Sequence, residues 1–193
     1  MKKVLLIDVD EVITFSDILD AINEFMNTDY SIDDFNTYFI DREVIPQDKI
    51  LEYNNYLVSR GFYKKPKVLP NAVEVIKDLN EIYDVYICSS CINLIDVNSS
   101  GAIYKDKFDF LVKLLPFINP KHFIFTSSKH LIKADIIIDD LIDNLKNDIE
   151  LKILFPSYHN KEYTADELKS FGIIRAGYDW QNGWEEIKKI FLW

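Results

Sequence analysis

The chain has 193 residues, of which 48% are hydrophobic, and a formal net charge of −10 at pH 7. This length and composition allow one sizeable buried core. The negative charge argues against non-specific binding to nucleic acid or to an anionic membrane surface, because both require a basic face. No apolar run approaches the length of a membrane span. Two cysteines without a second pair cannot complete a four-thiolate zinc site. We therefore expect a cytoplasmic protein, for which a homodimer remains an open alternative.

The first predicted strand is the apolar run from Val4 to Ile7, which ends on Asp8 and is followed by Asp10. Strand side chains alternate, so residues two positions apart face the same way. Two like charges at that spacing are unfavourable unless another group compensates them. A pair of aspartates at a strand end is most often an ordinary turn or helix cap. Its meaning here depends on the rest of the chain.

Residues 17–65 contain helical patterns but no convincing strand. Apolar residues recur at helical spacing in SDILDAINEFM (16–26) and again in QDKILEYNNYLVS (47–59). We therefore predict a helical insertion between the first and second strands. Ligands of an open α/β sheet bind beyond the C-terminal ends of its strands. The insertion is expected to cover that site as a cap.

Beyond residue 65, short apolar runs alternate with helical patterns. The runs are VYIC (85–88), FIF (123–125), III (136–138) and LKILF (151–155), and their lack of polar alternation is typical of strands buried on both faces. Helices are predicted from Asn71, which forms a capping-box pattern with Glu74, over 105–118, and at the C-terminus. The alternation predicts an α/β fold, with a parallel sheet between two helical layers, in which 1–16 and 66–193 form the core and 17–65 the cap.

Polar side chains stand at four of the predicted strand ends. They are Asp8 and Asp10 after the first strand, Ser89 and Ser90 after the second, Lys129 after the third, and Asp139 and Asp140 after the fourth. In a parallel sheet these ends meet at one edge. Four carboxylates there repel each other unless a cation lies among them, and oxygen ligands favour magnesium. Hydroxyls and a lysine beside the carboxylates suit phosphoryl transfer, in which an aspartate can be the nucleophile.

The order of these motifs resembles the haloacid dehalogenase superfamily of phosphatases. The segments DVDEV, LPNAVEVIKDL, VYICSS, KFDFLVKLL, FTSSK, ADIIIDD, HN (159–160) and WQNGWEEI (180–187) further resemble, in order and spacing, the 5'(3')-deoxyribonucleotidases. The resemblance extends over nearly the whole chain and is weakest in the predicted cap. It implies a Rossmann-like, haloacid dehalogenase-like fold, a Mg²⁺-dependent hydrolase of the phosphatase class, and deoxyribonucleoside monophosphates as small-molecule partners.

Carried over by position, the resemblance implies a role for each strand-end residue. Asp8 is the nucleophile and a metal ligand, and Asp10 is the general acid, whose backbone carbonyl also contacts the metal. Ser89, Ser90 and Lys129 bind phosphate. Asp140 is a metal ligand, with Asp139 beside it.

Two positions depart from the pattern of the family. Glu11 stands where the family usually has glycine, and Ser89-Ser90-Cys91 stands where it often has threonine-serine-proline. Neither departure removes a catalytic atom. Glu11, however, is expected to add a charge near the entrance of the cap, which bears on the range of substrates.

Simpler interpretations compete with the functional ones. The acids after the fourth strand can also favour a helix N-terminus, and Cys91 is more simply a bystander thiol than a nucleophile. Phe15, Tyr38, Phe39 and Phe62 can form a base and sugar pocket or merely the small core of the cap. Two functional alternatives remain: a phosphatase acting on another small phosphomonoester, and a non-catalytic binding protein. The presence of the strand-end aspartates and Lys129 argues against the second.

Overall fold

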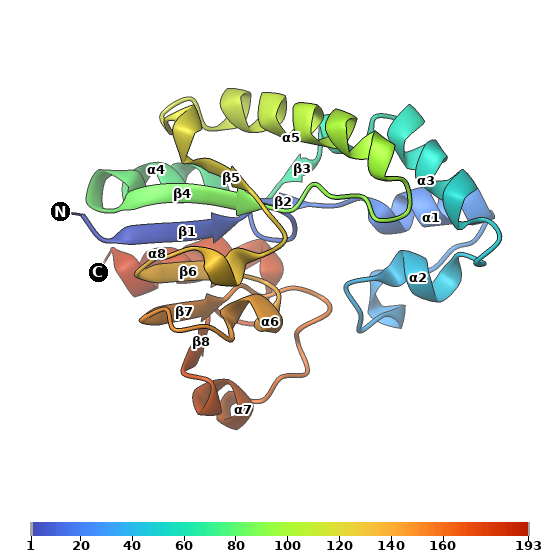
Figure 1. The fold of residues 1–193 in the computed structure, drawn as a ribbon. Helices are drawn as coiled ribbons and strands as arrows, with labels where there is room; N and C mark the ends of the chain where they lie inside the picture. The colour runs from blue at the N-terminus through green and yellow to red at the C-terminus, as the bar shows by residue number, and fades with distance from the viewer. Residues whose placement is uncertain (1, 193) are drawn as a thin grey trace.

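A six-stranded parallel sheet lies at the centre of the computed structural model, which describes residues 2–192 (Figure 1). Its strands are β1 (Val4–Asp8), β4 (Asp84–Ser89), β5 (Phe123–Phe125), β6 (Ile136–Asp139), β7 (Leu151–Leu154) and β8 (Ile173–Arg175), in the spatial order β5-β4-β1-β6-β7-β8. The predicted α/β Rossmann-like fold is confirmed. The edge strand β8 was not predicted. The terminal residues of the predicted core, Met1 and Trp193, lie outside the described residues.

Strand β1 occupies the middle of the sheet, between β4 and β6. Its residues Leu5, Leu6 and Ile7 are at most 1% exposed, because helices cover both faces. The register places Asp8 beside Cys88 of β4, and Ile7 beside Ile138 of β6. The C-terminal ends of these three strands therefore meet at one edge of the sheet, which is the edge where the predicted polar residues stand.

Helices form a layer on each face of the sheet. Helices α4 (Ala72–Ile82), α5 (Ser100–Leu114) and α8 (Gly183–Phe191) pack on the face that carries Leu5 and Ile7. Helices α6 (Ile142–Leu145) and α7 (Ala165–Ser170) pack on the face that carries Leu6. The alternation of side chains along β1 thus sends successive residues into two separate apolar clusters.

The predicted capping box at the start of α4 is wrong. Asn71 has a left-handed backbone conformation, with φ of 62°, and its side chain makes no capping hydrogen bond. Its Nδ2 instead donates to Oε1 of Glu185 in α8, at 2.8 Å. A contact with a distant helix has replaced the local cap, and the sequence pattern around Asn71 does not reveal that helix.

Residues 17–65, here called the cap segment, leave and rejoin the core through a short antiparallel ribbon of β2 (Thr14–Phe15) and β3 (Lys67–Val68). The segment contains α1 (Ile18–Met26), α2 (Ile40–Val44) and α3 (Ile50–Ser59). Its apolar residues, among them Ile22, Ile40 and Tyr53, form a third cluster. Figure 1 shows these helices beyond the C-terminal ends of β1 and β4. Within residues 2–192, no helix combines the length and apolarity needed to cross a membrane.

Candidate active site

Three buried carboxylates meet at the C-terminal edge of the sheet. Asp8 is the last residue of β1, Asp139 is the last residue of β6, and Asp140 follows it. Because β1 and β6 are neighbours, one oxygen from each of the three lies within 4.8 Å of the others. Burial, followed by the neighbouring carboxylates, raises the pKa of Asp140 well above its ordinary value. Burial also raises the pKa of Asp8, against the opposing effect of Lys129.

Lys129 binds two of these carboxylates. It begins a short 3₁₀ turn after β5, and its Nζ lies 2.7 Å from Oδ1 of Asp8 and 2.6 Å from Oδ2 of Asp139. Burial disfavours the ammonium, but the charges of the two carboxylates outweigh that effect and raise the pKa of Lys129 above its ordinary value. The lysine therefore remains charged and partly neutralises the acidic cluster.

Asp139 and Asp140 differ in how their oxygens are used. Both oxygens of Asp139 already accept hydrogen bonds: Oδ2 from Lys129, and Oδ1 from the Leu141 amide at 2.9 Å and from Asn144 at 3.0 Å. In Asp140, Oδ2 lies 2.8 Å from Nε2 of His159, whereas the buried Oδ1 has no hydrogen-bond partner among the described residues. A buried carboxylate oxygen without a donor is costly. The donor set therefore fits a hard divalent cation, with Asp140 supplying the available oxygen.

Asp10 forms a second ion pair, separate from that of Asp8. Nζ of Lys107, from α5, lies 2.6 Å from Oδ2 of Asp10. The Ser89 hydroxyl donates to the same oxygen at 3.0 Å, and Lys107 also donates to Ser89 Oγ at 3.0 Å and to the Ser90 carbonyl at 3.2 Å. Each of the two closely spaced aspartates thus has its own buried lysine. This arrangement resolves the repulsion that the spacing of Asp8 and Asp10 would otherwise cause.

Glu11 is buried, contrary to the expectation of a charge near the cap entrance. Its φ of 58° lies in the left-handed region that glycine adopts most readily. The carboxylate accepts hydrogen bonds from the amide and the hydroxyl of Ser16. Burial, partly offset by these bonds, raises the pKa of Glu11 to about 7. Glu11 is also not among the described residues that line the adjoining cavity.

A cavity of about 510 Å³ lies between the acidic edge of the sheet and the cap segment. The core side is lined by Asp8, Asp10, Ser90 and Lys129, and the cap side by Tyr38, Phe39, Arg42, Asn54 and Phe62, among others. The volume is in the range of small-molecule sites. Phe15 is not among the described lining residues, because its ring stacks on Trp180 with centroids 4.5 Å apart. Phe15, which the sequence suggested for a base and sugar pocket, therefore packs beside Trp180 and does not line this cavity.

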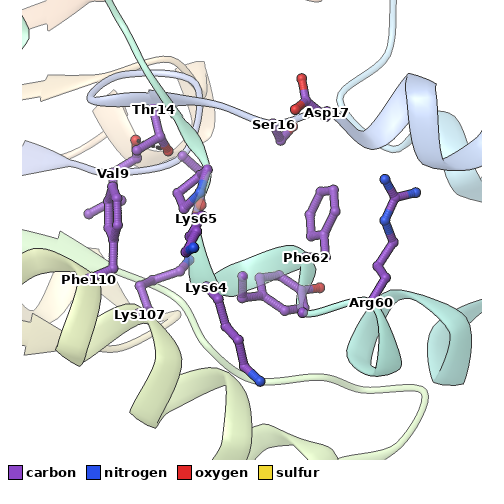
Figure 2. Close-up of a pocket in the computed structure, with 14 residues that line it drawn as sticks. Val9, Thr14, Ser16, Asp17, Arg60, Phe62, Lys64, Lys65, Lys107 and Phe110 are labelled. Carbon is purple, nitrogen blue, oxygen red and sulfur yellow. Dashed lines mark hydrogen bonds and ion pairs between the residues drawn. The ribbon is translucent and has the colours of Figure 1, made fainter.

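A second cavity, of about 400 Å³, borders the first (Figure 2). Lys107 reaches it from α5, and Lys64 and Lys65 line it from the end of the cap segment. Asp10 and Ser16 line both cavities. The ion pair between Asp10 and Lys107 therefore stands at the boundary between the two.

The model of one protein family, described as "5' nucleotidase, deoxy (Pyrimidine), cytosolic type C protein", matches residues 2–185. The chain belongs to this family. A protein of Staphylococcus aureus strain Mu50 named "Putative 5'(3')-deoxyribonucleotidase" is 32% identical to it over 193 residues, which cover 99% of this chain and 96% of the relative. The 5'(3')-deoxyribonucleotidase of Bacillus subtilis strain 168 is 29% identical over 194 residues, and the match covers the whole of both chains.

Solved structures support the same fold for this member of the 5' nucleotidase family. A haloacid dehalogenase-like family hydrolase from Streptococcus pneumoniae superposes with a TM-score of 0.57 at 15% identity and covers 98% of both chains. A haloacid dehalogenase-like hydrolase from Burkholderia xenovorans gives 0.55 at 14% identity. The chain is thus a hydrolase of the phosphatase class with a haloacid dehalogenase-like fold, as the sequence motifs predicted.

Two residues at this site were not predicted from the sequence. The sequence could have indicated that Lys107 is buried, because helical spacing places it on the same face of α5 as Ile103 and Leu111, each four positions away. A lysine on such a face is rarely buried unless it is paired. His159 belongs to the HN segment that carries part of the family resemblance, but its contact with Asp140 depends on how the loop after β7 folds back over the sheet edge.

Proposed function

We propose that this chain is a Mg²⁺-dependent phosphomonoesterase that dephosphorylates deoxyribonucleoside monophosphates through an aspartyl-phosphate on Asp8. The observation that carries this proposal is that two separate ion pairs, each with a buried lysine, stand at the rim of one cavity: Asp8 with Lys129, and Asp10 with Lys107. Two carboxylates with different partners can hold different protonation states, and a nucleophile and a general acid need that difference.

Asp8 and Asp140 would hold the cation, together with the backbone carbonyl of Asp10. The buried Oδ1 of Asp140, which has no donor among the described residues, supports this assignment. Asp139 would stabilise the site without binding the cation, because both of its oxygens already accept hydrogen bonds from Lys129, Leu141 and Asn144. When bound, Mg²⁺ would neutralise charge on the phosphoryl oxygens and on the carboxylate cluster.

In the first step, a carboxylate oxygen of Asp8 attacks phosphorus in line and forms an O–P bond as the bond to the sugar oxygen breaks. The leaving oxygen takes a proton from Asp10. Lys107 and Ser89 both bind Oδ2 of Asp10, so Oδ1 is the oxygen available to carry that proton. The phosphate would bring negative charge beside Lys107 and Lys129, which both line the cavity.

In the second step, water attacks the phosphorus of the aspartyl-phosphate. Asp10 takes a proton from that water, the bond between phosphorus and Asp8 breaks, and inorganic phosphate leaves. Asp8 returns to its carboxylate form and Asp10 to its protonated form, so the cycle closes without any further reactant. Lys129 binds Asp8 at 2.7 Å and compensates the charge of the departing phosphate.

The cap segment would bind the nucleoside. Tyr38, Phe39 and Phe62 line the cavity and offer aromatic surfaces on which a base can stack. The names of the relatives support a site in which the 2' position of the bound sugar has no hydrogen-bond partner, although the lining as a whole includes polar side chains such as Arg42 and Asn54. Burying a hydroxyl without a hydrogen-bond partner raises the free energy of the bound state by a few kcal/mol, which would lower kcat/KM roughly tenfold to a hundredfold. We therefore expect deoxyribonucleotides to be preferred.

Release of inorganic phosphate from a panel of substrates tests this function. The panel contains deoxyribo- and ribonucleoside 5'- and 3'-monophosphates and sugar phosphates, each measured with Mg²⁺ and with excess chelator, and Asp8→Asn serves as the inactive control. The proposal expects dUMP to be hydrolysed better than UMP, and activity to disappear with chelator. Better turnover of a sugar phosphate than of either nucleotide would transfer the substrate assignment to another small phosphomonoester. Full activity with chelator would overturn the cation site.

A further inference from the structure

The His159 side chain lies against the carboxylate of Asp140, at the most buried part of the acidic cluster. The two side chains are 5% and 0% exposed, and Nε2 of His159 lies 2.8 Å from Oδ2 of Asp140. When Asp140 is ionised, as a cation ligand must be, its carboxylate can only accept, and Nε2 of His159 then carries the proton of this hydrogen bond. One oxygen of Asp140 is thereby engaged and the other is left without a donor among the described residues.

Two tyrosine rings pack against the imidazole. The ring of Tyr158 packs against it edge to face, with centroids 5.1 Å apart and an interplanar angle of 89°. Tyr38 of the cap segment does the same at 5.3 Å and 87°. Such contacts leave the ring little rotational freedom. The direction of the Nε2–H bond is therefore set by packing before any ligand arrives.

The neighbouring Asn160 binds the backbone of the same aspartate. Its Nδ2 donates to the carbonyls of Asp140, at 2.9 Å, and of Phe155, at 2.8 Å. Its own Oδ1 accepts from the Ser157 amide at 3.1 Å and from Arg175 at 3.2 Å. The loop after β7 thus binds Asp140 twice, through its main chain by Asn160 and through its side chain by His159.

From this geometry we infer that His159 is a positioning residue, which holds Oδ2 of Asp140 so that Oδ1 is presented to the divalent cation. The inference rests on the proposed function only in sharing its cation site. A hydrogen bond to a ligating carboxylate fixes the orientation of the ligand, and loss of such a partner typically weakens metal binding by about 10- to 100-fold. Asp139 cannot replace Asp140 as a ligand, because both of its oxygens already accept hydrogen bonds, and Asp8 is already a ligand of the proposed site.

Direct binding of Mn²⁺ to the whole chain without substrate, followed by electron paramagnetic resonance, tests the role of His159. His159→Phe keeps a ring between the two tyrosines but removes the donor, and His159→Gln keeps a donor of similar reach. His122→Phe is the matched control, since His122 stacks on Tyr86 and contacts the Val85 carbonyl, away from the site. We expect His159→Phe to weaken Mn²⁺ binding about 10- to 100-fold, His159→Gln to restore most of it, and His122→Phe to leave it unchanged.

Two results distinguish a failure of the role of His159 from a failure of the proposed cation site. If wild type binds Mn²⁺ and His159→Phe binds it within twofold of wild type, the role of His159 is overturned while the cation site stands. If wild type itself fails to bind Mn²⁺, the cation site of the proposed function is overturned as well. Circular dichroism confirms that each variant is folded. If His159→Phe unfolds, His159→Gln against His159→Ala provides the same comparison, and equal affinities in that pair would also overturn the role.

Discussion

The ammonium of Lys107 lies 2.6 Å from the carboxylate of Asp10, although 97 positions separate the two residues in the chain. Lys107 comes from the buried face of α5, and its side chain is 7% exposed. Asp10 would otherwise face Asp8 across a short distance in the same acidic site. The pair therefore joins the layer of helices to the proposed general acid.

Lys107→Met should lower kcat/KM for nucleotides by about tenfold to a hundredfold, because Asp10 loses a charged hydrogen-bond partner. The loss should be smaller for an activated aryl phosphate, whose leaving group needs little protonation. Lys105→Met is the matched control on the same helix, where Lys105 is exposed and pairs only with Asp109 among the described residues. Equal losses for the two lysine variants, measured by steady-state kinetics, would contradict the role of Lys107.

Asp8→Asn keeps the size of the side chain but removes the attacking charge, so turnover should fall on the order of 10³-fold or more while the fold is retained. Asp10→Asn should also be severe, with its largest effect on poor leaving groups. Phosphate release from dUMP and from an aryl phosphate measures both effects. More than a tenth of wild-type activity in Asp8→Asn would rule out a covalent aspartyl-phosphate.

Lys129→Ala should cost about 2–4 kcal/mol of transition-state stabilisation, the scale of a lost preorganised donor. Lys129 is buried and binds both Asp8 and Asp139. Lys133→Ala is the matched control, since Lys133 is exposed and lies just before β6, at the opposite edge of the sheet. Its kinetics should be close to those of wild type, and the reverse order of effects would contradict the assignment of the site.

Glu11 should make stability depend on pH in the cation-free protein. Its pKa is raised from 4.5 to about 7 in the folded state, so the folded chain holds the proton more tightly than the unfolded chain does. Between these values the folded state binds more protons, and the free energy of unfolding should fall as pH rises. At about 1.4 kcal/mol per pKa unit, the fall in the free energy of unfolding is at most about 3.5 kcal/mol.

Glu11→Gln removes this titration and keeps an acceptor for Ser16. Urea unfolding of wild type and Glu11→Gln at pH 4.5, 6 and 7.5, with chelator present, should show a stability difference that grows in favour of the variant as pH rises. A difference that does not change across this range would mean that Glu11 titrates as an exposed glutamate does.

Gly183→Ala should destabilise the fold by about 1–3 kcal/mol, the cost of overpacking a core. A Cβ at Gly183 would clash with Cζ of the Phe155 ring, which is fully buried. Gly101→Ala is the matched control in α5, where a Cβ would meet nothing within 4 Å, and it should be neutral or slightly stabilising. Urea unfolding compares the two, and equal stabilities would show that α8 shifts freely against Phe155.

The sequence by itself was sufficient to predict most strands of the sheet and the positions of three of the buried carboxylates. The apolar runs that become β1, β4, β5, β6 and β7 have no polar alternation, because helices cover both faces of the sheet. The carboxyl ends of parallel strands must meet at one edge. The positions of Asp8, Asp139 and Asp140 therefore followed from strand placement alone. The three-residue β8 and the two-residue strands at the base of the cap segment were missed, because such short segments carry no periodic signal.

The tertiary structure alone decided which groups complete the site. Lys107 reaches Ser89 from 18 positions along the chain, and His159 reaches Asp140 from 19. Neither residue stands at a strand end, so no topological rule brings it to the sheet edge. The position of Lys107 depends on how α5 packs on the sheet, and that of His159 on how the loop after β7 folds back against Tyr38 and Tyr158.

The position of Phe15 was likewise decided by packing. Its aromatic ring is suited to stacking on a base, but the chain near α8 packs so that this ring lies against Trp180. Packing between distant segments sets these contacts, so a local pattern can indicate that a residue such as Lys107 is buried but not which group it contacts.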